Sequence, residues 1–250
     1  MAEKIIKNFL VTGTPRSSTT WFCKTLNSHE NIWVPEFPNY EPFNPHAIPK
    51  ITNKLKVSLF DQFAVIDTLK KEAEKKEVDY LGIKTFNSYH YSIPNLIDAY
   101  DFSIFLLLRK NIWKVLGSLL LAVDNKNWAG SSKRFEPFFF ENSHREQRRI
   151  LTIFDRLCLN YWLAENYFCN HKNFIEKVYM EDIVDGQTSF KKINEFFAMD
   201  IDLSNSYTED DLSFYYKNFD ELKHCIVTHC KSAQYHYSAL PDYILKELDL

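Results

Sequence analysis

The sequence predicts an α/β fold: a single domain whose central parallel sheet is flanked by helices on both faces. Strand-length apolar segments alternate with segments of helical periodicity, the pattern of a parallel sheet with crossover helices. The segment 102–108 (FSIFLLL) is continuously apolar, as expected of a strand buried on both faces. The segment 7–13 (KNFLVTG) is an apolar run that ends in glycine and leads into a loop rich in serine and threonine. These three observations define the fold class.

The remaining elements continue this alternation in chain order. Helices are predicted where apolar residues share one helical face, and strands where short apolar runs lie between polar segments. Five prolines mark 35–49 as a loop. No repeat or linker divides the chain, so residues 1–250 are predicted to form one domain. The predicted elements are a helix over 18–28, a strand over 32–34, a helix over 60–76, strands over 80–84 and 102–108, helices over 111–123 and 146–169, a strand over 173–179, a helix over 188–197 and further helices beyond.

Composition limits the classes of function. The formal net charge is −3 and there is no basic tail, whereas nucleic-acid binders usually carry a dense cationic face. We therefore expect no nucleic-acid partner. No apolar run reaches the ~18–20 residues that a bilayer crossing needs, and residues 1–8 lack the apolar core of a secretory signal. Five scattered cysteines fit a reducing compartment. These features predict a cytoplasmic protein without a membrane span, and they leave its oligomeric state open.

The segment 13–21 (GTPRSSTTW) connects the first predicted strand to the first predicted helix. Its backbone N–H groups and hydroxyls can cradle an anion at the helix N-terminus. A nucleotide-binding P-loop would read G-x-x-x-x-G-K-[ST], but here Thr19 occupies the place of the lysine and a cation comes earlier, at Arg16. The segment is thus a P-loop-like anion site, or alternatively a helix cap without a ligand. The candidate binding residues are Pro15, Arg16, Ser17, Ser18, Thr19, Thr20 and Trp21.

The pattern Pro-[Lys/Arg]-Ser-x-Thr-Thr-Trp after a strand resembles the 5'-phosphosulfate-binding loop of sulfotransferases that use 3'-phosphoadenosine 5'-phosphosulfate (PAPS). That family usually has glycine at the position of Ser18, and serine fits there if it has ordinary helix-start dihedrals. The family binds the 3'-phosphate of its donor with an arginine at a strand end and a serine in the next helix. Arg109 and Ser118 match this pair, nine residues apart instead of the usual eight. Lys110 could share the task of Arg109. The alternative is that Arg109 caps the strand and Ser118 only packs in a helix.

Weaker similarities extend this resemblance over about residues 8–200. The segments 80–85 (YLGIKT), 178–183 (VYMEDI) and 194–199 (NEFFAM) are each similar to a segment of the family. The resemblance implies PAPS as co-substrate, 3'-phosphoadenosine 5'-phosphate (PAP) as product, and no metal. His224-Cys225 and His229-Cys230 could suggest zinc, but their spacing of five residues is rare among zinc ligands.

The predicted chemistry is an in-line displacement in which charge stabilisation is the main catalytic contribution. As the S–O bond breaks, negative charge grows on the leaving phosphate oxygen, and Arg16 is the candidate to stabilise it. Lys84 is a second candidate near the transferred group, or else a surface lysine at the end of a strand.

A general base must take the proton of the acceptor. In small-molecule members of the family a histidine follows a Lys-Thr pair, but here Phe86 follows. The segment 40–43 (YEPF) instead resembles the Glu-Pro loop of carbohydrate-modifying and bacterial members, which makes Glu41 the first candidate. Glu36 is the second candidate and His90 the third.

The expected acceptor is a small neutral or cationic molecule, because an acidic protein is poorly suited to a sulfated polymer. A carbohydrate or glycolipid hydroxyl is the alternative acceptor. Two other classes stay open: a P-loop kinase or NTPase, and a nucleotide-binding relative of this fold without catalysis.

Overall fold

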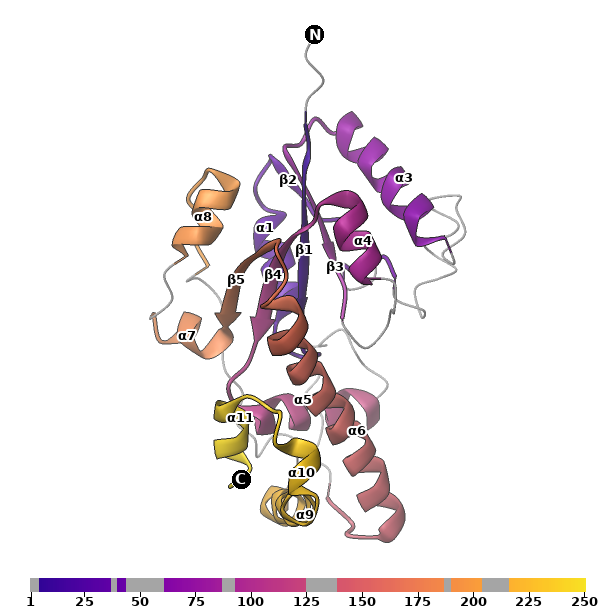
Figure 1. Ribbon diagram of the computed structural model, residues 1–250, viewed down its shortest axis with the longest axis vertical. Coiled ribbons are helices and arrows are strands. Elements are labelled where there is room, and N and C mark those ends of the chain that lie inside the picture. Colours follow the sequence, from indigo (N-terminus) through magenta and orange to yellow (C-terminus); the bar gives the residue numbers. More distant parts are fainter. Residues whose placement is uncertain are drawn as a thin grey trace.

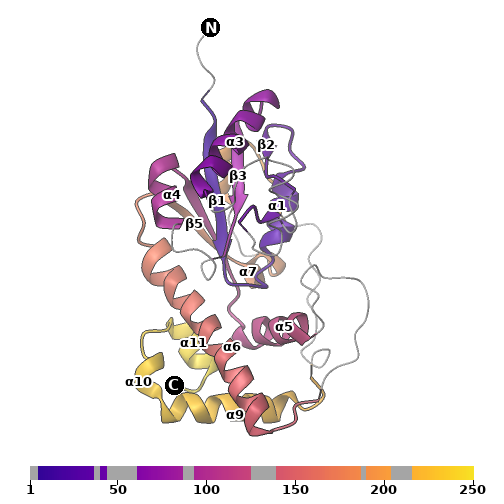
Figure 2. The same cartoon turned by 90° about the vertical axis from the view of Figure 1, so that its right-hand side faces the viewer.

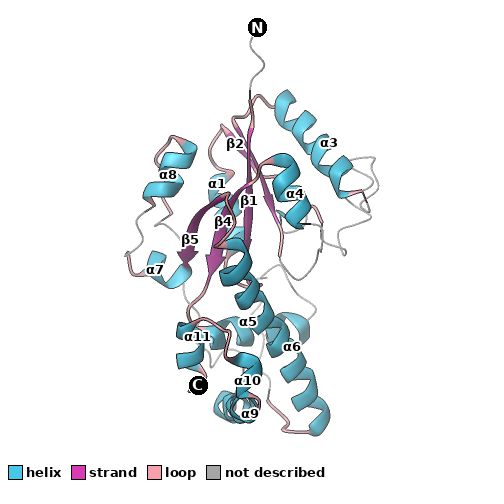
Figure 3. Cartoon of the chain, in the orientation of Figure 1, coloured by secondary structure: helices cyan, strands magenta, loops and turns pink. Residues whose placement is uncertain are grey.

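The computed structural model describes residues 5–36, 40–43, 61–86, 93–124, 139–186, 190–203 and 216–250. Within these residues, five strands form one parallel sheet in the order β2-β3-β1-β4-β5, with helices on both faces (Figures 1 and 3). This architecture confirms the predicted α/β fold.

The observed elements follow the predicted order. Every predicted strand is present, with ends that differ by one residue at most. In order the elements are β1 (Lys7–Gly13), α1 (Thr19–Leu26), β2 (Ile32–Trp33), α3 (Gln62–Lys75), β3 (Tyr80–Lys84), α4 (Ile93–Tyr100), β4 (Ser103–Leu108), α5 (Ile112–Asp124), α6 (His144–Leu163), a π-helical turn η4 (Ala164–Phe168), β5 (Phe174–Tyr179), α7 (Met180–Val184), α8 (Lys191–Phe197), α9 (Phe219–Ser232), α10 (Gln234–Tyr237) and α11 (Asp242–Glu247).

Two helices were not predicted. The helix α4 has eight residues and α7 has five, so neither is long enough for the apolar spacing to stand out. The predicted helix over 146–169 is also not uniform, because its last turn is the π-helical turn η4.

The two faces of the sheet are covered by different helices. Helices α3 and α4 pack on one face, where Leu69 and Ile97 meet Leu10 and Ile104 of the strands. Helices α1, α7 and α8 pack on the other face (Figure 2). There Phe9 and Phe105 lie against the rings of α8, with the Phe9 and Phe197 centroids 5.1 Å apart. Each strand therefore has apolar side chains on both faces, as a buried parallel sheet requires.

A third core lies beyond the carboxyl ends of the strands, where α5, α6, α9, α10 and α11 pack together (Figure 1). Trp113 of α5 and Phe154 of α6 are stacked 6.3 Å apart within it. This helical layer faces the edge of the sheet at which ligands of open α/β folds bind. Among the described residues, no helix combines the length and apolar character that a bilayer crossing needs.

Gly13 ends β1 at a point where no side chain fits. A Cβ atom there would lie 1.9 Å from the carbonyl oxygen of Leu107, its partner residue in β4. Because the obstacle is backbone, it cannot move without separating the two central strands. Glycine at this position lets the loop after β1 start directly beside the end of β4.

Gly13→Ala is expected to lower the free energy of unfolding by about 3 kcal/mol, because the added methyl group would overpack the β1–β4 pairing. Gly186→Ala is the matched control: Gly186 has φ +65° and nothing within 4 Å of its added Cβ, so only the backbone cost of about 1 kcal/mol is expected. Urea unfolding of both variants measures the difference. Equal losses of unfolding free energy in the two variants would show that the contact between position 13 and the Leu107 carbonyl does not exclude a side chain.

Candidate active site

The candidate site lies where the chain switches from adding strands on one side of β1 to adding them on the other. The chain leaves the central strand β1 toward β2 and β3 on one side, and then returns to form β4 and β5 on the other. In such sheets the carboxyl ends of the strands on either side of this switch point border a ligand crevice. Residues 14–18 follow β1 at this position, and residues 109–111 follow β4 beside them.

The loop after β1 has a backbone shape that its sequence does not suggest. Arg16 has φ 66° and Ser18 has φ 62°, both in the left-handed region. Ser18 therefore does not have ordinary helix-start dihedrals. It has a conformation that suits glycine, which is the usual residue at this position in the family that the segment resembles. Each left-handed residue costs about 1–2 kcal/mol relative to the right-handed region. Strained residues of this kind gather at binding and catalytic sites.

The hydroxyl of Ser18 does not cap the helix. Ser18 is the N-cap residue of α1, yet its side chain makes no capping hydrogen bond. Its Oγ instead accepts from the guanidinium of Arg109 at 3.4 Å. The Ser18 side chain therefore contributes to the contact with Arg109 and not to capping α1.

The other residues of the loop have distinct roles. Ser17 is buried, and its hydroxyl donates to the carbonyl oxygen of Thr14 at 2.6 Å, which closes the turn. Pro15 and Thr19 are also buried, whereas Thr20 is exposed. Trp21 is half-buried and packs against the core on the α1 face of the sheet.

The two predicted motifs meet in the structure. Arg16 donates from Nε to the Oγ of Ser118 in α5 at 2.8 Å, and Arg109 reaches Ser18 in the loop. Arg109 and Ser118 are each 8% exposed. These hydrogen bonds orient the two guanidinium groups. Two cations thus link the loop after β1 to the turn after β4 and to the middle of α5, and guanidinium groups are suited to binding anions.

Lys110 points elsewhere. Its ammonium forms an ion pair with Asp182 and lies 5.2 Å from the centroid of the Tyr179 ring. The hydrogen bond with Asp182 is the main cause that raises the pKa of Lys110. The placement of Lys110 therefore favours Arg109 as the cation beside the loop.

Lys84 and Glu41 form a buried ion pair at the end of β3. The Lys84 Nζ lies 3.0 Å from Oε1 of Glu41, with side-chain exposures of 1% and 7%. The same ammonium donates to Oγ1 of Thr20 at 2.6 Å and lies 5.0 Å from the centroid of the Phe86 ring. Lys84 is thus not a surface lysine, and Glu41 is not a solvent-facing carboxylate. The pair joins the loop over 40–43 to the first turn of α1.

Cys23 lies behind this pair and is fully buried. Burial is the main cause that raises the pKa of its thiol to about 12, with a smaller opposing effect of Lys84. The thiol is therefore neutral at ordinary pH and is not a nucleophile.

The other two base candidates are not part of this arrangement. Glu36 is exposed, and its Oε1 accepts from Nδ2 of Asn27 at 3.0 Å. His90 lies outside the described residues. For the metal hypothesis, the described residues hold no group of three or more His, Cys, Asp or Glu side chains able to bind an ion.

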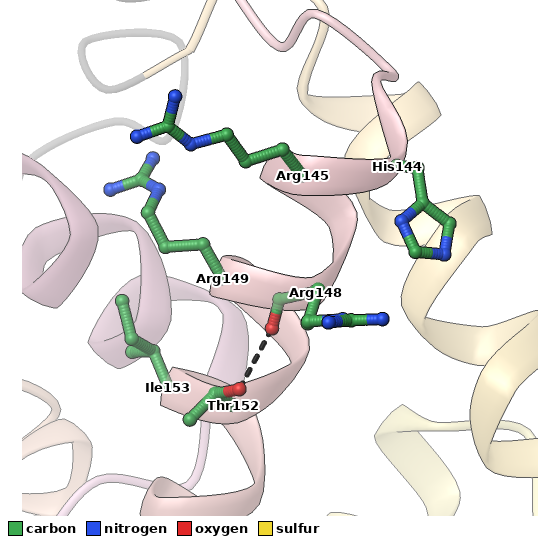
Figure 4. Close-up of a pocket in the computed structure, with 6 residues that line it drawn as sticks. All are labelled: His144, Arg145, Arg148, Arg149, Thr152 and Ile153. Carbon is green, nitrogen blue, oxygen red and sulfur yellow. Dashed lines mark hydrogen bonds between the residues drawn. The ribbon is translucent and has the colours of Figure 1, made fainter.

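A hollow of about 450 Å³ lies on the first turns of α6, and none of its lining residues belongs to the loop over 14–18 (Figure 4). The side chains of Arg145 and Arg149 extend to one side of the helix and that of His144 to the other. Arg149 is tied to Asp124 and Glu146 by ion pairs. Arg149 of this hollow therefore already has anionic partners.

Sequence reasoning gave no role to two residues that contact the site, although Glu181 lies in the segment 178–183 that it singled out. Tyr161 donates from its hydroxyl to the carbonyl oxygen of Arg109 at 2.8 Å, and Glu181 accepts from the N–H groups of Lys110 and Asn111. No local pattern marks these contacts, because each partner lies on a distant element.

Comparison with known proteins gives little further information. No family model matches this sequence, and no curated protein matches it either. Among solved structures, the chain is similar to the sulfotransferase domain from the Synechococcus PCC 7002 olefin synthase. The match covers 85% of this chain and 82% of that one, with 14% identity and a TM-score of 0.40, which is too distant to inform the site.

Lys84→Met is expected to lower the free energy of unfolding by about 3 kcal/mol, because it leaves the Glu41 carboxylate buried without its cation. The double variant Lys84→Met, Glu41→Gln should lose less than the sum of the two single variants, with a coupling of about 1–3 kcal/mol in chemical denaturation. Lys110→Met, which breaks a half-exposed pair, is the control and should cost less than about 1 kcal/mol. Additive losses would contradict the pairing.

Proposed function

We propose that this chain is a sulfotransferase that moves the sulfuryl group of PAPS onto a hydroxyl or amine of a small acceptor and releases PAP. The convergence of Arg16 and Arg109 on the strand-loop-helix after β1 is the observation that carries this proposal. A donor with phosphate groups at both ends of its ribose needs cations from two directions. These two arginines come from the ends of adjacent strands.

The donor would be held by residues already in place. The loop over 14–18 and the start of α1 would bind the 5' side, with Thr19 and Thr20 in the first turn. Arg109 and Ser118 would bind the 3'-phosphate. The contact between Ser118 and Arg16 supports this assignment, because it brings the α5 serine next to the loop.

The chemical step needs a cation, a base and no change of oxidation state. A new S–O or S–N bond forms to the acceptor while the S–O bond to the 5'-phosphate breaks, and the acceptor proton passes to the base. Arg16 would stabilise the charge that develops on the leaving phosphate. Glu41 would take the proton, and its carboxylate lies 3.0 Å from the ammonium of Lys84.

A carbohydrate hydroxyl is the second candidate acceptor. The resemblance of the segment 40–43 to the Glu-Pro loop of carbohydrate-modifying members favours it. A kinase reaction has less support: Thr19, which holds the place of the Walker lysine, is a buried threonine.

Calorimetric titration with PAP and with ATP plus magnesium is the first test. We expect micromolar affinity for PAP and at least about tenfold weaker binding of ATP, because two cationic groups flank the loop and the Walker lysine is absent. A preference for ATP, or no binding of either ligand, would contradict the proposed function.

Arg109→Ala is expected to weaken PAP binding about 30-fold, the effect of losing a charge-assisted contact of about 2 kcal/mol. Lys110→Ala removes the neighbouring cation and serves as the control, with a change below about threefold expected. Calorimetry of both variants measures the contrast. A larger loss for Lys110→Ala would move the 3'-phosphate contact to that residue.

Arg16→Ala is expected to lower turnover by about 10²–10³, since it removes the group that stabilises the leaving phosphate.

Glu41→Gln should lower turnover by about 10²-fold or more through loss of the base, with PAP affinity within about threefold of wild type. Transfer of ³⁵S from labelled PAPS to a panel of phenols, amines and sugars measures the turnover of both variants. Unchanged turnover in Glu41→Gln would assign the base to Glu36 or His90.

A further inference from the structure

The turn over 109–111, which carries the anion-binding arginine, is held by two side chains from elements outside it. Tyr161 of α6 donates from its hydroxyl to the carbonyl oxygen of Arg109 at 2.8 Å. Glu181 of α7 accepts from the N–H of Lys110 at 3.0 Å and from the N–H of Asn111 at 3.3 Å. Three consecutive residues of the turn are therefore fixed through their main chain.

We propose that Tyr161 and Glu181 are positioning residues that form a clamp on this turn and set the place of the Arg109 guanidinium for the donor's 3'-phosphate. The clamp rests on the proposed function, because it assumes that Arg109 binds an anion. Both residues act through the backbone of the turn, and the Tyr161 hydroxyl also lies beside Thr14 in the loop after β1.

The Tyr161 hydroxyl can serve only as a donor in this contact. A carbonyl oxygen accepts hydrogen bonds and cannot donate them. Tyr161 is fully buried, and burial is the main cause that raises its pKa well above the ordinary value, so the phenol keeps its proton. Its ring meets the ring of Tyr243 of α11 edge-on, with centroids 6.3 Å apart. The donor thus comes from the packed helical layer, which fixes its direction.

Glu181 is placed by the register of the sheet. The last residues of β4 and β5, Leu108 and Tyr179, are paired, so α7 begins beside the turn that follows β4. Its carboxylate takes two N–H groups at the start of α5, where a negative charge is also favoured by the helix dipole. Asp182, the next residue of α7, pairs with the half-exposed Lys110 side chain.

The position of the turn determines how Arg109 meets the loop. The guanidinium of Arg109 reaches Ser18 at 3.4 Å, across the gap between the ends of β1 and β4. Freeing the carbonyl or the N–H groups would let the main chain shift. The guanidinium would then shift with it and change its distance to Ser18.

Hydrogen exchange of the turn tests the clamp without a ligand. Tyr161→Phe keeps the ring and removes the hydroxyl, and Glu181→Gln keeps the shape and replaces one acceptor with a donor. Exchange at the amides of Lys110 and Asn111, measured by NMR, should become about tenfold faster in both variants, the effect of one lost hydrogen bond to a buried or charged group.

Tyr237→Phe is the matched control for this experiment. Tyr237 is also a buried tyrosine of the helical layer, and its hydroxyl donates to Oδ1 of Asp155 at 2.6 Å. It should leave exchange at Lys110 and Asn111 unchanged. Unchanged exchange in Tyr161→Phe and Glu181→Gln as well, or an equal increase in Tyr237→Phe, would overturn the clamp.

Calorimetry with two ligands then tests whether the clamp positions Arg109 for the 3'-phosphate. PAP carries the 3'-phosphate and adenosine 5'-phosphate does not, so the clamp variants should lose about five- to tenfold in PAP affinity and less than twofold for adenosine 5'-phosphate. Equal losses for both ligands would indicate general damage and contradict the positioning role. A wild-type protein without preference for PAP would contradict the proposed function, whereas unchanged exchange contradicts the clamp itself.

Discussion

The close approach of β1 and β4 at Gly13 is the constraint on which the site depends. Because the Cβ-free residue lies against the Leu107 carbonyl, the loop after β1 and the turn after β4 begin side by side. Arg16 can then reach Ser118 of α5, and Arg109 can reach Ser18 of the loop. A wider separation of the two strands would leave each arginine with its own segment. The backbone contact therefore brings the residues of the candidate site together from two distant parts of the chain.

The site concentrates charge and strain that stability alone would not favour. The chain has a formal net charge of −3, yet Arg16, Lys84 and Arg109 gather at one edge of the sheet with Glu41. Buried ion pairs often contribute little or nothing to stability, and left-handed residues cost energy. Such groups are gathered at functional sites more often than stability alone would favour.

The sheet and the helical layer contribute different parts of this arrangement. The sheet supplies the loop, the strand ends and the Lys84–Glu41 pair. The helical layer supplies Ser118, which contacts Arg16, and Tyr161, which contacts Arg109. The layer thus has a second role beyond burying apolar surface: it holds the turn after β4 against the end of the sheet. Changes in α6 can therefore alter the position of Arg109 from a distant element.

The sequence by itself determined the fold class, the strands and the two motifs, because apolar periodicity and the residues around Arg16 are local signals. It also named Glu41 and Lys84, but not their pairing. The left-handed conformation of Ser18 could not be predicted, since serine rarely adopts it and the surrounding structure imposes it. The roles of Tyr161 and Glu181 were missed for a related reason: their hydrogen bonds join elements far apart in sequence. Only the tertiary structure decided which side chains meet, because strand order and register set distances that no local pattern encodes.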